Sequence, residues 1–283
     1  MPSDVAIVYD FDGTLARGNL QEASFIPEIG MERSEFWDTV KATAKQHDAD
    51  EILVYMQLML LKAQKNGIKV TRRDLERHGA AGSLFPGLAD QSWFQRINRF
   101  GAESNLNIKH YIVSSGLKEM ILGSPIAHQM DHIFASSFIY ENEVAVWPAL
   151  AINYTTKTQY LFRINKGILN AWDGAALNAY MHNSERPVPF ERIIFVGDGD
   201  TDIPTMKMTT YQGGYSVAVY DPSREDHALH KVHKLISDNR VNFVAPADFS
   251  ENSHFDIIIK GVLGRMARRA ALATTRPPKP SCP

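Results

Sequence analysis

The sequence has very little cysteine, no long apolar run and almost no excess charge, and each absence excludes a class of protein. Its one cysteine, Cys282, allows no internal disulfide and no thiolate metal site, so metal ligands would have to be oxygen or imidazole. The most apolar run, Ile52 to Leu61, is too short to cross a bilayer. The 30 basic and 32 acidic residues leave a formal charge of −2, which gives no general attraction for nucleic acid or an anionic membrane.

The remaining composition is that of a globular protein. The 283 residues are enough for a core domain of ordinary size plus an insert, or for two modest domains. Of these residues, 44% are hydrophobic and 22% are charged, which argues against disorder. Asp4 comes early, and no basic region precedes an apolar stretch, so no signal peptide is indicated. We therefore expect a cytoplasmic protein with no nucleic-acid or membrane partner. The sequence does not indicate its oligomeric state.

Short apolar, β-branched runs that end in small polar residues predict the fold. Four such runs are Val5 to Tyr9, His110 to Val113, Arg192 to Val196 and Tyr215 to Tyr220. Runs that are apolar at successive positions are typical of strands buried on both faces of a parallel sheet. The repeated order of strand, polar loop and helix predicts a doubly wound α/β sheet. Because ligands bind beyond the carboxyl ends of such strands, the polar residues are expected to meet at one site.

A long helical stretch separates the first two predicted strands. Ser34 to Ala44 and Asp50 to Lys65 resemble amphipathic helices, and Asp50 suits the N-cap of the second. A crossover between parallel strands needs only about a dozen residues. Residues 16–82 are therefore predicted to form an inserted helical domain, called the helical insert below. Its aromatic residues are assigned to packing: Phe25, Phe36, Trp37 and Tyr55.

The other predicted boundaries follow from this division. Residues 1–15 and 83–275 are expected to form the α/β core. A second insert is expected between Phe134 and Ile152, with a small hairpin over Ser137 to Val146. Residues 276–283 contain four prolines and are expected to be a disordered tail.

Asp10 and Asp12 lie two residues apart, directly after the first predicted strand. Two carboxylates in this position can share one metal ion and divide the roles of nucleophile and general acid–base. Gly13 allows the chain to turn tightly, and Thr14 can form a hydrogen bond nearby. The alternative is an ordinary strand end with an Asp-Gly turn.

A second acidic segment follows the third predicted strand, from Gly197 to Asp202. Acidic residues at alternate positions also occur in calcium-binding loops, where the sixth residue is Gly and the twelfth is Glu. Counted from Asp198, these positions are Ile203 and Thr209, which excludes that motif. The segment instead suits a strand-terminal loop in which Asp198 and Asp202 complete a magnesium site.

Residues from two further segments are candidates for holding a phosphate. Ser114, Ser115 and Gly116 offer hydroxyl and backbone N–H groups at a strand end, although the same tripeptide also occurs in ordinary loops. Lys157 lies near the start of a helix-like run that ends at Lys166, and its charge could neutralise the phosphate and the nucleophile. Lys166 is the competing candidate, and a solvated lysine is the alternative to both.

Together, these segments resemble the motifs of the haloacid dehalogenase-like hydrolase superfamily. Asp10 to Leu15 resembles its first motif (DxDGT), Ser114 its second, Lys157 its third and Gly197 to Asp202 its fourth (GDGxxD). The motifs occur in the expected order and at the expected strand ends. The resemblance implies a Rossmann-like core, and a helical insert between the first two motifs is the cap type of phosphoserine-phosphatase-like members.

The resemblance also implies a function, a magnesium-dependent phosphatase that hydrolyses a small-molecule phosphomonoester. Asp10 would attack phosphorus to give an aspartyl-phosphate, and Asp12 would protonate the leaving oxygen and then activate water. Members that dehalogenate lack an aspartate at the second position, so Asp12 favours phosphate chemistry.

The remaining roles follow from the same resemblance. The magnesium ion would bind the carboxylates of Asp10 and Asp198 and the backbone carbonyl of Asp12, with Asp202 as a supporting residue. Ser114 and Lys157 would hold the phosphoryl oxygens. A phosphotransferase or mutase with the same intermediate is the alternative enzyme. A non-catalytic binder is the alternative outside enzymes, but such a protein is expected to lack one of the two aspartates.

Phosphoserine is not expected to be the preferred substrate. Phosphoserine phosphatases carry a Glu nine positions after the nucleophile, where it holds the amino group of the substrate, and here that position is Asn19. An amide lacks the charge that strengthens a hydrogen bond to an ammonium. Glu22 could take this role from three residues further along. Arg17 adds positive charge nearby, which suits an anionic or neutral leaving group.

Overall fold

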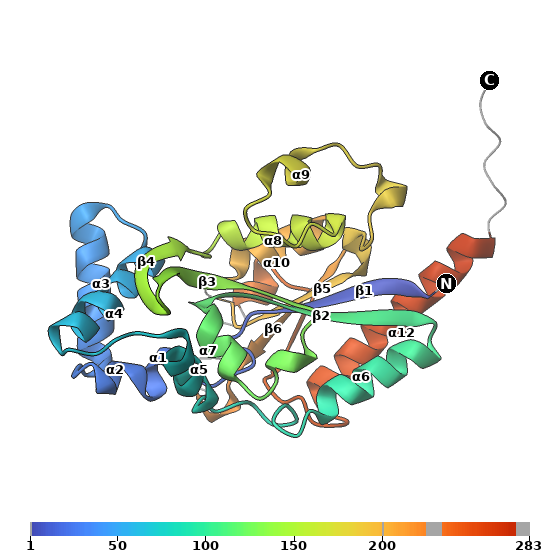
Figure 1. Cartoon of the computed structure of the whole chain (residues 1–283). Coiled ribbons are helices and arrows are strands. Elements are labelled where there is room, and N and C mark those ends of the chain that lie inside the picture. The colour runs from blue at the N-terminus through green and yellow to red at the C-terminus, as the bar shows by residue number, and fades with distance from the viewer. Residues whose placement is uncertain (1, 200, 225–233, 276–283) are drawn as a thin grey trace.

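The computed structural model describes residues 2–199, 201–224 and 234–275, so the predicted tail at 276–283 lies outside the described residues. Its central feature is a sheet whose strands have the order β4-β3-β2-β1-β5-β6-β7 (Figure 1). The strands are β1 (Ser3–Tyr9), β2 (Leu106–Leu117), β3 (His132–Glu141), β4 (Val144–Leu150), β5 (Ile193–Gly197), β6 (Tyr215–Tyr220) and β7 (Phe243–Pro246). Every neighbouring pair is parallel except β3 and β4. The predicted doubly wound α/β fold is confirmed.

Helices lie on both faces of the sheet and beyond one end of it (Figure 1). They are α1 (Leu20–Ala23), α2 (Phe25–Glu28), α3 (Arg33–His47), α4 (Glu51–Lys65), α5 (Arg72–Ala80), α6 (Ser92–Glu103), α7 (Lys118–Gly123), α8 (Thr156–Lys166), α9 (Gly174–Asn178), α10 (Ile203–Tyr211) and α12 (His254–Thr275). Short 3-10 turns are Ala127–Gln129, Asn183–Glu185, Phe190–Arg192 and Pro222–Arg224. Helices α6 and α12 cover one face, and α8 and α10 cover the other (Figure 1).

Strand β1 supplies side chains to the hydrophobic cores on both faces. Val5, Ile7 and Tyr9 belong to the core that includes side chains of α6 and α12. Ala6 and Val8 belong to the core that includes side chains of α8 and α10. Side chains alternate between the two faces of a strand, so a strand that is apolar at every position is buried on both sides. This burial fixes β1 at the centre of the sheet and places Asp10 just beyond its carboxyl end.

The helical insert contains helices α1 to α5. Asp50 caps α4 as predicted, because its side chain accepts hydrogen bonds from the backbone N–H groups of Ile52 and Leu53, at 2.9 and 3.0 Å. The segments that enter and leave the insert run side by side, joined by an antiparallel bridge between Ala16 and Leu84. That residues 16–82 form a separate domain stays a prediction.

The expected hairpin is present as β3 and β4, and it is longer than predicted. Because β3 also pairs in parallel with β2, the hairpin extends the main sheet. It also contacts the helical insert, where the N–H of Ala145 donates to the carbonyl oxygen of Val70 at 2.8 Å. The hairpin thus helps to hold the insert over the carboxyl ends of the central strands.

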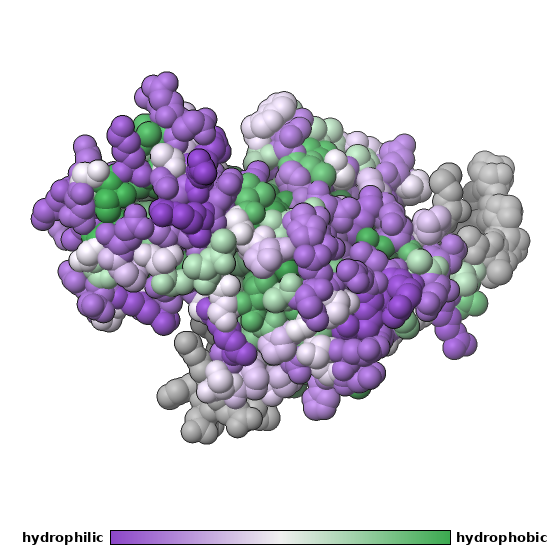
Figure 2. Space-filling model, turned by 60° about the horizontal axis from the view of Figure 1, so that its bottom comes forward, coloured by the Kyte–Doolittle hydropathy of each residue, from purple (hydrophilic) through white to green (hydrophobic). Residues whose placement is uncertain are grey.

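The surface differs from these cores in composition. Hydrophilic side chains cover most of the face in Figure 2, and the hydrophobic ones gather in small patches. Among the described residues, no helix combines the length and the apolar character needed to span a membrane.

Two glycines let α5 of the insert approach α7 of the core closely. A Cβ atom at Gly79 would lie 1.8 Å from the carbonyl oxygen of Met120, and a Cβ at Gly123 would lie 1.8 Å from that of Glu76. Both obstacles are backbone atoms, so a side chain at either position would force the two helices apart.

We therefore expect Gly79→Ala to lower the free energy of unfolding by about 1–3 kcal/mol, the usual cost of overpacking. Gly261→Ala in α12 is the matched control, because a Cβ there meets nothing within 4 Å. The control is expected to be neutral or to stabilise by up to about 1 kcal/mol, the difference in helix propensity. Urea denaturation of both variants measures this. Equal stabilities would contradict the close contact between α5 and α7.

Candidate active site

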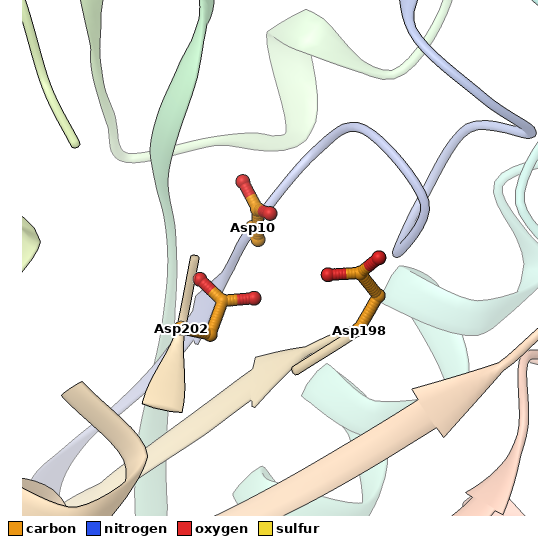
Figure 3. A group of neighbouring side chains, drawn as sticks. All are labelled: Asp10, Asp198 and Asp202. Atoms are coloured by element: carbon orange, nitrogen blue, oxygen red, sulfur yellow. The ribbon is translucent and has the colours of Figure 1, made fainter. Parts of the chain in front are cut away.

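The carboxyl ends of β1 and β5 bring together three aspartates from two distant segments of the sequence. Tyr9 is paired with Val196, and the N–H of Asp10 donates to the carbonyl oxygen of Val196 at 2.9 Å, so the residues that follow the two strands are neighbours. One carboxylate oxygen from each of Asp10, Asp198 and Asp202 lies within 4.8 Å of the others. Figure 3 shows these carboxylates gathered around one space, Asp10 after β1 and the other two after β5.

Lys157 from α8 reaches this cluster and has no solvent exposure. Its Nζ lies 2.7 Å from Oδ1 of Asp202 and 3.0 Å from Oδ1 of Asp10, and it donates to Oγ1 of Thr201 at 3.1 Å. Burial alone would lower the pKa of Lys157, but the neighbouring carboxylates raise its pKa above the usual value. The ammonium therefore stays charged beside the acid cluster.

Lys166, the competing lysine, lies elsewhere. Its Nζ donates to the backbone carbonyl oxygens of Leu177 and Ala179, at 2.5 and 2.7 Å. Its role is to connect the end of α8 to the segment around α9. Of the two candidates, the geometry favours Lys157.

The environment of Asp10 suits a bound cation. Burial, followed by repulsion from Asp202, raises the pKa of Asp10 well above its usual range, and Lys157 only partly opposes this. Oδ2 of Asp202 is buried and has no hydrogen-bond partner among the described residues. Among the described residues, these three carboxylates face a single lysine, so a divalent ion would balance the remaining charge and favour the ionised form of Asp10. Carboxylate oxygens are the ligands that Mg²⁺ prefers, so these residues fit that ion.

Asp12 lies outside this cluster and faces the end of β2. Its Oδ1 accepts a hydrogen bond from the N–H of Leu20 at 3.1 Å. Burial raises the pKa of Asp12 to about 7, although the bond from Leu20 opposes the shift. A Cβ atom at Gly116 would lie 2.7 Å from Oδ2 of Asp12, so glycine is needed there for the carboxylate to keep its place.

The predicted phosphate-binding tripeptide lies within β2, rather than in a loop after it. The pairing of β2 with β3 shifts register between Ser114 and Leu117, and this irregularity turns the tripeptide toward the site. Oγ of Ser114 accepts the N–H of Gly116 at 3.0 Å, so that N–H is already engaged. The carbonyl oxygen of Ser115 accepts the hydroxyl of Tyr55 at 2.9 Å, while Oγ of Ser115 has no partner among the described residues.

The turn after Asp12 brings two further predicted residues beneath the site. Gly13 has a φ of +76°, and a Cβ atom there would lie 2.7 Å from Oδ2 of Asp198. Glycine is therefore required for both the turn and the approach to Asp198. Thr14 is buried, and its Oγ1 has no hydrogen-bond partner among the described residues, so the bond expected for it is not formed.

A cavity of about 250 Å³ lies above the carboxylates, between the core and the helical insert. The core side is lined by Asp10, Asp12, Ser114, Ser115, Gly116, Asp198 and Thr201. The insert side is lined by Asn19, Gln21, Trp37, Glu51, Ile52 and Tyr55. Sequence reasoning assigned no site role to Gln21, Glu51, Ile52 or Thr201. It assigned Phe25, Phe36, Trp37 and Tyr55 of the insert to packing. Trp37 and Tyr55 in fact line the cavity, and Phe25 and Phe36 do not.

The two charged residues expected near the substrate, Glu22 and Arg17, are engaged elsewhere. Oε1 of Glu22 accepts hydrogen bonds from Asn19 and from Nε1 of Trp37, both at 2.7 Å, and its Oε2 pairs with Arg33 at 2.8 Å. Arg17 pairs with Asp221 at 2.8 Å. Neither residue lines the cavity, so neither is placed to contact a ligand there directly.

Comparisons with known proteins agree with this fold. The chain is 28% identical over 277 residues to an uncharacterized protein of Borreliella burgdorferi, covering 88% of this chain and 93% of the relative. A solved hydrolase of Salmonella enterica serovar Typhi superposes with a TM-score of 0.55 at 18% identity, over 92% of this chain and 71% of that chain. A phosphoserine phosphatase, described as a phospho-aspartyl intermediate analogue, superposes with a TM-score of 0.53 at 15% identity, over 92% of this chain and 99% of that chain.

These likenesses show a shared fold. The family profile of the haloacid dehalogenase-like hydrolases matches residues 7–207, a range that begins in β1, includes the helical insert and ends in α10. It therefore covers all the residues gathered at the cavity. The chain belongs to the haloacid dehalogenase-like hydrolase family.

Proposed function

We propose that this protein is a magnesium-dependent phosphatase that hydrolyses a small-molecule phosphomonoester through an aspartyl-phosphate on Asp10. The observation that carries the proposal is the arrangement of Asp10, whose carboxylate lies at the floor of a cavity, beside Lys157 and two further aspartates. The family membership and the fold shared with a phosphoserine phosphatase support it.

The carboxylates of Asp10 and Asp198 and the backbone carbonyl of Asp12 would hold the Mg²⁺ ion. When bound, the ion would act as a Lewis acid and neutralise charge on the phosphoryl oxygens. Asp202 is fully buried and, in this proposal, supports the site by fixing the ammonium of Lys157.

Asp10 would attack phosphorus, forming a bond from its carboxylate oxygen while the bond to the ester oxygen breaks. An anion attacks an anion in this step, and two unit charges about 4 Å apart repel by on the order of 4 kcal/mol at an effective dielectric constant near 20. Lys157 opposes this repulsion, because its Nζ lies 3.0 Å from Oδ1 of Asp10. The hydroxyl of Ser114 would hold a phosphoryl oxygen. Phosphoryl transfer depends mainly on such positioning and charge neutralisation.

Asp12 would move the protons in both steps. In the first step its carboxyl group donates a proton to the leaving alcohol. In the second, the carboxylate takes a proton from the water that attacks the aspartyl-phosphate, which releases phosphate and restores Asp10. A pKa of about 7 suits a group that must both donate and accept a proton near neutral pH.

The helical insert would serve as the cap that excludes water during the first step. Two polar contacts join it to the core beside the cavity, one from Tyr55 to the carbonyl oxygen of Ser115 at 2.9 Å and one between Asp50 and Asn153. Excluding water protects the phosphoryl group from side reactions and strengthens the electrostatic interactions around it.

Asp10→Asn is expected to lower kcat for para-nitrophenyl phosphate by about 10⁴-fold or more, the usual scale for loss of a nucleophile. Asp38→Asn, on the exposed face of α3, makes the same change in charge and should keep the wild-type rate. Circular dichroism checks that both variants are folded. Wild-type turnover by a folded Asp10→Asn protein would rule out the covalent mechanism. The reaction products separate the two kinds of enzyme, because a hydrolase releases inorganic phosphate and a phosphotransferase forms a new phosphate ester.

Asp198→Ala is expected to raise the Mg²⁺ concentration needed for half-maximal activity by about tenfold or more, since loss of a ligand weakens a site that has few. Calorimetric titration of Mg²⁺ into the protein gives a second readout that does not depend on turnover. Asp38→Ala is the control and should bind the ion as the wild type does. Full activity after treatment with a chelator would show that no metal is needed.

A further inference from the structure

The cavity has two chemically different sides, one formed by the core and one by the helical insert. The inference drawn from this difference rests on the proposed function. The phosphate would occupy the core side, above Asp10 and Lys157, so the alcohol part of the substrate would face the helical insert. The side chains of the insert that line the cavity therefore select the leaving group. A volume of about 250 Å³ leaves room only for a small one.

Two aromatic rings form an apolar wall on the insert side. The rings of Trp37 and Tyr55 have centroids 5.8 Å apart and are inclined by 66°. Their polar atoms are already engaged, because Nε1 of Trp37 donates to Glu22 and the hydroxyl of Tyr55 donates to Ser115. The two side chains consequently offer the cavity their ring surfaces, which are electron-rich and attract cations.

Two side chains beside this wall offer acceptor oxygens. Glu51 is exposed but lines the cavity, and its carboxylate makes no hydrogen bond or ion pair among the described residues. Gln21 is 2% exposed and also lines the cavity, and its Oε1 has no hydrogen-bond partner in the described parts of the chain. An unpartnered buried acceptor is costly, and a ligand that brings a donor removes that cost.

The described residues of the same wall carry no positive charge. None of the described residues that line the cavity is a lysine or an arginine. The nearby cations of the insert are paired with other groups, Arg17 with Asp221 and Arg33 with Glu22. A carboxylate on the leaving group would thus meet Glu51 without a compensating cation, whereas an ammonium would be attracted.

We propose that the substrate is the phosphomonoester of a small amino alcohol that carries no carboxylate. Glu51 and Gln21 accept hydrogen bonds from its ammonium, and Trp37 and Tyr55 enclose it. The expected preference against phosphoserine is kept, but its reason changes. The carboxylate of phosphoserine finds no partner, while its amino group would be accepted.

The test compares O-phosphoethanolamine with propyl phosphate, in which a methyl group replaces the ammonium. The wild-type kcat/KM should be higher for O-phosphoethanolamine by about tenfold or more, the factor expected for a charge-assisted hydrogen bond. Glu51→Gln should bring the ratio close to one. Glu35→Gln, an exposed glutamate of α3 that does not line the cavity, should leave the ratio as in the wild type. A helix-stabilising role of Glu51 at the first turn of α4 would not change this ratio.

Three results would overturn the inference. The first is a wild-type ratio near one, and the second is a ratio that does not change in Glu51→Gln. The third is a kcat/KM for phosphoserine or a pyrimidine nucleoside monophosphate that exceeds the kcat/KM for O-phosphoethanolamine. Hydrolysis of para-nitrophenyl phosphate separates this inference from the proposed function, which survives if only the selectivity is wrong. If no ester is hydrolysed, the proposed function fails. Calorimetric affinities for O-phosphoethanolamine and propyl phosphate then test the ammonium preference directly, with equal affinities counting against it.

Discussion

Lys157 is buried without solvent exposure, and the arrangement of the candidate site depends on how its charge is satisfied. An ammonium that loses its water is very unfavourable unless carboxylates pair with it. Asp10 and Asp202 do so, at 3.0 and 2.7 Å, and in this way connect α8 to the ends of β1 and β5. Because these carboxylates also repel each other and Asp198, the cluster retains an excess of negative charge. The carboxylates that pair with Lys157 thus include the proposed nucleophile, Asp10, and leave a net negative charge that a divalent cation would neutralise.

Much of this could be predicted from the sequence because strand ends obey a simple geometric rule. Parallel strands end at the same edge of a sheet, so polar residues after Tyr9 and after Val196 had to be neighbours once both runs were recognised as strands. The doubly wound fold and the family are confirmed on this basis. The choice between Lys157 and Lys166 required the structure. Both lie on α8, but at opposite ends of it: Lys157 is in the first turn, where its Nζ reaches Asp10 and Asp202, whereas Lys166 is the last residue and bonds to carbonyl oxygens beside α9.

The wall of the cavity could not be predicted, since it depends on how the helical insert docks on the core. Periodicity locates the apolar face of α4, but Glu51 at its first turn and Tyr55 one turn later both reach the cavity, although one is exposed and the other buried. Position in the sequence made Glu22 the natural candidate for binding an ammonium. The carboxylate of Glu22 is instead paired with Arg33 and accepts a hydrogen bond from Trp37, and no local sequence pattern predicts these partners. Long-range docking, rather than local propensity, decides which side chains line the cavity.

The central claim is that the phosphoryl group passes through Asp10 before it reaches water. The most direct test is the stereochemistry of the reaction at phosphorus, because it does not require the intermediate to accumulate. An isotopically chiral phosphorothioate monoester is hydrolysed in labelled water, and the configuration of the inorganic thiophosphate is determined. Two successive in-line displacements, one by Asp10 and one by water, predict retention of configuration. Inversion would mean that water attacks the ester directly, and would contradict the account.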